Sequence, residues 1–120
     1  MKLYRPVGPK ELELIKQSDM KEFPPRLPEQ PIFYPVLNVE YARQIAKEWN
    51  AKSAPGFAGF VTEFEVEDSY ISGFEIKTVG ASFHKELWIP AEELENFNKH
   101  IIGQIKVIES YYGEGYTESS

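Results

Sequence analysis

The 120-residue sequence contains no cysteine, only two histidines and no long apolar run. Without cysteine the chain has no disulfide, iron–sulfur cluster, thiolate zinc site or cysteine nucleophile. The histidines, His84 and His100, stand outside any HExxH-like arrangement, so we predict no metal site. Every apolar run falls far short of the ~20 residues that a membrane-spanning helix needs, so we expect no membrane partner.

Positive charge is also scarce. There are 13 basic residues against 19 acidic ones, which gives a formal net charge of −6. Because a protein that grips duplex nucleic acid normally presents a basic stripe, we expect no duplex nucleic-acid partner. Residues 1–7 pass directly into patterned sequence without an apolar signal stretch, so the expected location is cytoplasmic.

What is present is typical of one globular domain. Hydrophobic residues make up 42% and charged residues 27% of the chain. The aromatic share of 14% suits a dense core or a pocket in which a flat ligand stacks. Residues 111–120 are rich in Gly, Ser and Glu without a period. We therefore expect a single domain over residues 1–110 and a flexible tail over 111–120.

Hydrophobic periodicity predicts an α+β fold with largely antiparallel sheets and two or three short helices. Pro9 suits a first helical position, and Asn38 suits a helix N-cap. Prolines concentrate in residues 18–31, which we predict to be an irregular loop. The expected helices cover residues 9–17, 39–49 and 91–98, and the expected strands cover 2–7, 32–36, 60–66, 74–79, 84–89 and 101–108, with a turn at 68–73.

Three polar residues occupy predicted strands where apolar residues are expected. Arg5 shares a strand face with two apolar residues, and a buried guanidinium needs a carboxylate partner or an anionic ligand. Tyr34 is either a core residue with a satisfied hydroxyl or a stacking ring. Glu86 shares a face with His84 and Trp88 and is either a solvated strand residue or a site carboxylate. No phosphate-binding glycine loop, dinucleotide fingerprint or nucleophile elbow accompanies them.

Three segments carry a resemblance to a known family. They are Leu-Tyr-Arg-Pro-Val at residues 3–7, the proline-rich residues 23–31, and Trp-Ile-Pro-Ala-Glu-Glu-Leu at residues 88–94. Through them residues 2–108 resemble the ADP-ribosyltransferase fold, and in particular a family of short bacterial proteins labelled "ADP-ribosylation/crystallin J1".

The resemblance implies NAD⁺ as co-substrate and names five site residues. Glu86 matches the catalytic carboxylate that stabilises a ribosyl cation as nicotinamide leaves. Arg5 matches the arginine that holds the dinucleotide. Tyr34 and Tyr41 are candidates to stack on the cationic nicotinamide ring. The family pattern has tyrosine where this chain has Phe33, and a one-residue shift changes the strand face, so either Phe33 or Tyr34 is the stacking ring.

The resemblance leaves the acceptor and the activity open. Relatives that modify arginine carry Glu or Gln where this chain has His84, so the acceptor is an unknown protein or small molecule. Arg26 either meets a phosphate or lies in solvent. We interpret the chain as an NAD-dependent ADP-ribosyltransferase, a glycosyltransferase. The alternative is a catalytically inactive nucleotide- or protein-binding module on the same fold. RNA 2′-phosphotransfer would need more basic residues than the chain has.

Overall fold

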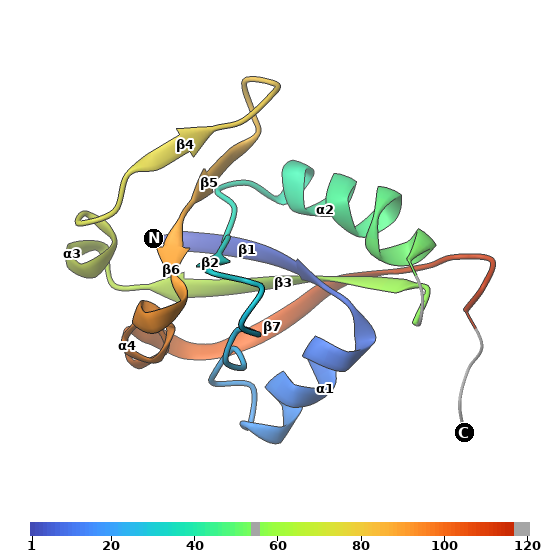
Figure 1. The fold of residues 1–120 in the computed structure, drawn as a ribbon, viewed down its shortest axis with the longest axis horizontal. Helices are drawn as coiled ribbons and strands as arrows, with labels where there is room; N and C mark the ends of the chain where they lie inside the picture. Colours follow the sequence, from blue (N-terminus) through green and yellow to red (C-terminus); the bar gives the residue numbers. More distant parts are fainter. Residues whose placement is uncertain (54–55, 117–120) are drawn as a thin grey trace.

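Antiparallel strands form the framework of the fold (Figure 1). The structure is a computed structural model that describes residues 1–53 and 56–116. The main sheet has the order β1-β3-β7, and two smaller two-stranded sheets pair β2 with β6 and β4 with β5. The strands are β1 (Lys2–Val7), β2 (Ile32–Phe33), β3 (Ala58–Val66), β4 (Ile76–Thr78), β5 (Lys85–Leu87), β6 (Ile89–Pro90) and β7 (Ile101–Tyr112).

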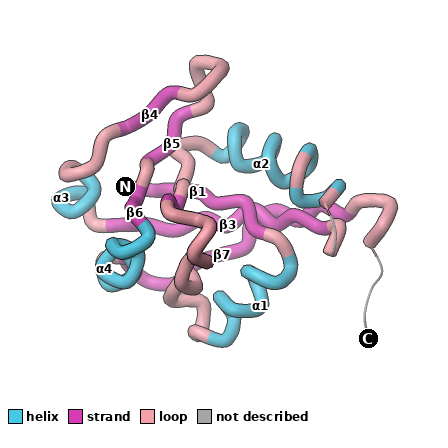
Figure 2. Tube along the Cα trace, viewed as in Figure 1, coloured by secondary structure: helices cyan, strands magenta, loops and turns pink. Residues whose placement is uncertain are grey.

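Four short α-helices connect and cover the strands, so the fold is α+β with antiparallel sheets, as expected (Figure 2). Pro9 fills the first position of α1, where its missing N–H costs nothing. The Asn38 side chain accepts the Tyr41 backbone N–H at 2.8 Å and so caps α2. The helices are α1 (Pro9–Gln17), α2 (Val39–Glu48), α3 (Asp68–Ile71) and α4 (Leu94–Lys99), with 3₁₀ turns η1 (Asn50–Lys52) and η2 (Ala91–Glu93).

A single residue, Val36, joins β1 to β5. Tyr4 and Val36 exchange two backbone hydrogen bonds, at 2.9 and 2.8 Å, and Val36 also pairs with Glu86. In an antiparallel ladder the next bonded pair after Tyr4 and Val36 would be Pro6 and Tyr34. Pro6 has no N–H to donate, so Pro6 and Tyr34 cannot exchange two hydrogen bonds as Tyr4 and Val36 do. The chain around Tyr34 therefore separates from β1, and β2 pairs with β6 instead.

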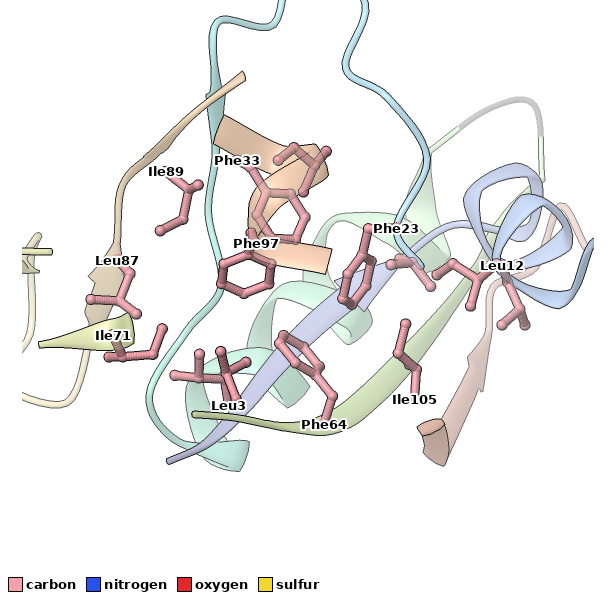
Figure 3. Close-up of a cluster of buried hydrophobic side chains, with 14 residues drawn as sticks. Leu3, Leu12, Phe23, Phe33, Phe64, Ile71, Leu87, Ile89, Phe97 and Ile105 are labelled. Atoms are coloured by element: carbon pink, nitrogen blue, oxygen red, sulfur yellow. The ribbon is translucent and has the colours of Figure 1, made fainter. Parts of the chain in front are cut away.

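The two faces of the main sheet are covered by different apolar clusters. On one face α2 packs on a small cluster that includes Val36 and Val61. On the other face lies a larger cluster rich in phenylalanine (Figure 3). Its central ring, Phe33, lies 5.0 Å from the ring of Phe23 and 5.3 Å from that of Phe97, measured between centroids. This cluster joins β1 and β3 to the β2–β6 pair.

The structure departs from the predicted elements in several places, and two of the predicted strands are shorter than expected, with β2 ending at Phe33 and β4 covering only Ile76–Thr78. The expected turn at 68–73 contains the one-turn helix α3. The expected strand 84–89 is divided into β5 and β6. The last strand extends to Tyr112, two residues into the expected tail, because Tyr111 and Tyr112 pair with Gly59 and Ala58. Residues 117–120 of that tail lie outside the described residues. No described helix has the length and apolar character needed to cross a membrane.

Glu109 ties β7 to α2 through an ion pair that should make stability depend on pH. Arg43 donates two hydrogen bonds of 2.7 Å to its carboxylate, and Tyr111 donates its hydroxyl. The bonds from Arg43 lower the pKa of Glu109 to about 2. A carboxylate whose pKa is lower in the folded state stabilises the protein above its unfolded pKa, and this contribution disappears as pH falls toward the folded pKa.

We therefore expect Glu109→Gln to be less stable than wild type near neutral pH, with a difference that shrinks as pH falls from about 5 to about 2. Urea unfolding, followed by circular dichroism near neutral pH and near pH 3, measures the difference. Glu65→Gln, at an exposed position of β3, is the control. A difference of the same size at both pH values would contradict the prediction.

Candidate functional site

Glu86 on β5 is buried and its carboxylate is held from two sides. Glu86 is only 8% exposed. The Tyr41 hydroxyl donates a hydrogen bond to Oε2 at 2.9 Å, and the Trp88 indole N–H donates one to Oε1 at 2.7 Å. Glu86 is therefore not a solvated strand residue. Charge-assisted bonds of this kind fix the position of the carboxylate.

Tyr41 holds Glu86 from the first turn of α2. Burial, followed by the hydrogen bond to Glu86, raises the pKa of Tyr41 to about 12, so its hydroxyl stays protonated at neutral pH. Its ring stacks on His84 with a centroid separation of 4.4 Å, and His84 Nε2 lies 2.9 Å from Gln44 Oε1. Beside these rings is a shallow groove of about 390 Å³ that continues along α2 to Trp49.

Two exposed rings lie next to Glu86. Because Val36 pairs with Glu86 and side chains alternate along strands, Tyr34 and Trp88 lie on the same side as Glu86. Their ring centroids are 6.0 Å apart, and the residues are 38% and 41% exposed. We call the set Tyr34, Tyr41, Glu86 and Trp88 the aromatic–carboxylate surface. It offers a fixed carboxylate beside the exposed Tyr34 ring, and beside a Trp88 ring over which Lys77 Nζ lies 5.2 Å from the centroid.

The structure places Arg5 and Phe33 elsewhere, on the side of the sheet that faces the phenylalanine cluster. Arg5 donates two hydrogen bonds to Glu11 of α1, from Nε at 2.7 Å and Nη2 at 3.0 Å. Its guanidinium carbon lies 4.7 Å from the Phe33 ring centroid. Phe33 is 1% exposed, whereas Tyr34 is exposed, so of the two candidate stacking rings only Tyr34 faces solvent.

Sequence reasoning missed two of these partners. The first is Trp88, which shares a predicted strand face with Glu86 but has no predicted role. Because the two residues are two positions apart in a strand, their side chains are neighbours on one face, and this spacing could have identified the indole N–H as a donor to Glu86. Glu11 is the second missed partner, through its two hydrogen bonds with Arg5. Nothing in its spacing from Arg5 predicts a two-bond ion pair, because the pair forms only after α1 folds back beside β1.

The chain matches no protein-family model, no curated protein and no solved structure. Within residues 1–53 and 56–116 no three His, Asp or Glu side chains gather as a metal site would need. The functional proposal below therefore depends on the geometry of the aromatic–carboxylate surface, together with the family resemblance of the sequence.

Proposed function

We propose that the protein binds NAD⁺ at the aromatic–carboxylate surface and transfers ADP-ribose to an acceptor, with release of nicotinamide. The observation that supports this most is the fixed Glu86 carboxylate beside the exposed rings of Tyr34 and Trp88. In the reaction the bond from ribose C1′ to the nicotinamide nitrogen breaks, and its electron pair leaves with nicotinamide. The acceptor then attacks C1′ and loses a proton.

Each residue has a role that its chemistry supports. Glu86 stabilises the positive charge that develops on the ribose as the bond breaks. Tyr34 offers a π face to the cationic nicotinamide ring, and Trp88 offers one once the Lys77 ammonium, which lies 5.2 Å from its centroid, is displaced. Tyr41 is a positioning residue, because its hydroxyl orients Glu86. Arg5 is proposed as the dinucleotide anchor through Nη1, the guanidinium nitrogen outside its two bonds to Glu11, and because Arg5 lies on the Phe33 side of the sheet the dinucleotide must extend beyond the aromatic–carboxylate surface to reach it.

A second candidate function is binding of a nucleotide or a protein without turnover. The observation that favours it is that both Glu86 oxygens already accept hydrogen bonds and the residue is only 8% exposed. With so little of Glu86 exposed, a ribose has limited access to the carboxylate. If the carboxylate stays covered, the same surface binds a flat ligand but leaves the glycosidic bond intact.

The test is nicotinamide release from NAD⁺ by the wild-type protein, with and without a cell extract that supplies acceptors, beside a thermal-shift titration with NAD⁺. A ligand that binds only the folded state raises the unfolding midpoint. Release together with a shift supports the transferase, and a shift without release supports the binding module. No shift at millimolar NAD⁺ and no release would contradict both.

Tyr34→Ala should weaken NAD⁺ binding roughly 5–10-fold, because a stacked ring contributes about 1–1.5 kcal/mol to binding. Tyr112→Ala is the matched control, since Tyr112 is 56% exposed at the far end of β7. The dissociation constants follow from the thermal-shift titrations of the three proteins. Equal constants for wild type and Tyr34→Ala would remove Tyr34 from the site.

A further inference from the structure

The three arginines differ in what they contact. Arg5 and Arg43 each donate two hydrogen bonds to one carboxylate, that of Glu11 or Glu109. Arg26 has no hydrogen bond or ion pair to any residue of the described ranges 1–53 and 56–116, and its Nε atom is buried. Removing a charged donor from water without an acceptor is unfavourable. Arg26 therefore has a buried donor atom, Nε, without a described acceptor, and an anion could supply that acceptor.

Positive charge exceeds negative charge around Arg26. Its guanidinium carbon lies 6.0 Å from the centroid of the Phe33 ring, and that of Arg5 lies 4.7 Å from the same centroid. Glu11 is the carboxylate that balances one of these two charges. Burial lowers the pKa of Arg26, the charge of Arg5 lowers it further, and Glu11 and Tyr34 act in the opposite direction. Among the described residues, Glu11 is thus the one carboxylate that acts on Arg26, and it already pairs with Arg5.

The segment that carries Arg26 is held in place before any ligand binds. Phe23 and Asn98 of α4 exchange hydrogen bonds of 2.9 and 3.0 Å. Further along, the Gln30 backbone N–H donates to the Leu27 carbonyl at 2.8 Å. The prolines between them restrict the backbone, because each fixes φ. Arg26 is therefore presented by a preformed loop, which lowers the entropy cost of binding.

We propose that Arg26, together with Arg5, binds a phosphate group of a ligand. A tetrahedral phosphate has enough oxygens to accept from two guanidinium groups at once, whereas Glu11 is already engaged by Arg5. The phosphate belongs either to a nucleotide or to a simple phosphate compound, and both present the same oxygens. The site lies on the Phe33 side of the sheet, so it requires neither Glu86 nor turnover.

The probes are inorganic pyrophosphate and ADP-ribose, titrated at low ionic strength while the unfolding midpoint is recorded. Saturating probe should raise the wild-type midpoint by roughly 5 °C or more. Arg26→Gln should bind at least about 10-fold more weakly, because it loses the charge and the two-pronged donor. Lys21→Gln removes the same charge from an exposed neighbour in the loop and should change the affinity less than about 2-fold.

The unliganded midpoint of Arg26→Gln should be close to or above that of wild type, since the arginine loses no described hydrogen bond or ion pair and only a distant contact with the Phe33 ring. Wild type that does not respond to millimolar probe overturns the proposal. Equal binding by Arg26→Gln, or an equal loss in Lys21→Gln, also overturns it. Tighter binding of ADP-ribose than of pyrophosphate supports a nucleotide phosphate, and equal binding supports a simple one. Glu86→Gln should bind pyrophosphate like wild type, so failure of the transferase proposal leaves this result intact.

Discussion

Glu86→Gln is expected to lower nicotinamide release by ~10²–10³-fold while leaving NAD⁺ binding close to that of wild type. The substitution keeps the size of the side chain and removes its negative charge. A charge that stabilises a cation formed near the transition state affects turnover far more than ground-state binding. The measurement is the initial rate of nicotinamide release at several NAD⁺ concentrations, which separates kcat from KM.

The hydrogen bonds around Glu86 determine which controls this experiment needs. A glutamine has one acceptor oxygen and one NH2 group, so it keeps both contacts only if its oxygen accepts from Trp88 and the Tyr41 hydroxyl turns to accept from its NH2 group. The urea midpoint of the variant shows how much stability this rearrangement removes. Glu65→Gln makes the same substitution at an exposed position of β3 and should keep the full rate. A rate in Glu86→Gln equal to that of wild type would contradict the transferase proposal.

Local rules were sufficient for β1, α1 and α2. Alternation of apolar residues predicted β1 with its observed bounds, Lys2–Val7, and Pro9 predicted the start of α1. The Asn38 cap predicted α2, which ends one residue earlier than expected. Each of these features depends on residues that are neighbours in sequence, so the sequence alone contains the information.

Two of the departures depend on pairing between distant segments. β2 is short because Pro6, more than 25 residues earlier, cannot donate to the chain at Tyr34. β7 runs past the expected end because Gly59 and Ala58 offer it partners. The hydrophobic periodicity of neither segment indicates which strand it pairs with. Such lengths are set when the sheet assembles, and local pattern cannot predict them.

The candidate site likewise contains contacts that the sequence predicts and contacts that it does not. Alternation predicted that Glu86 and Trp88 share a strand face, and the hydrogen bond between their side chains confirms it. That Tyr41 would cover Glu86 could not be predicted, because it depends on how α2 packs across the sheet. The absence of a described partner for Arg26 depends likewise on where every nearby carboxylate lies in the folded chain.

Phe97→Ala should cause the largest loss of stability that we predict, about 3–5 kcal/mol in the free energy of unfolding. Phe97 is fully buried, and its ring centroid lies 5.3 Å from that of Phe33 and 6.1 Å from that of Phe64 (Figure 3). These neighbours belong to different sheets, so truncation of Phe97 opens a cavity at their junction. The free energy of unfolding of a small domain is only about 5–15 kcal/mol, so the substitution removes a large share of it.

Urea unfolding and a thermal scan measure the loss, which should lower the midpoint by more than about 10 °C. Phe83→Ala is the matched control, because Phe83 is 38% exposed and should lose no more than about 1 kcal/mol. The junction also carries function in our proposals, since Phe33 supports both Arg5 and Arg26. Pyrophosphate should therefore raise the free energy of unfolding of Phe97→Ala less than that of wild type, when both proteins are measured below their unfolding midpoints. Equal losses in Phe97→Ala and Phe83→Ala would show instead that the phenylalanine cluster does not hold the sheets together.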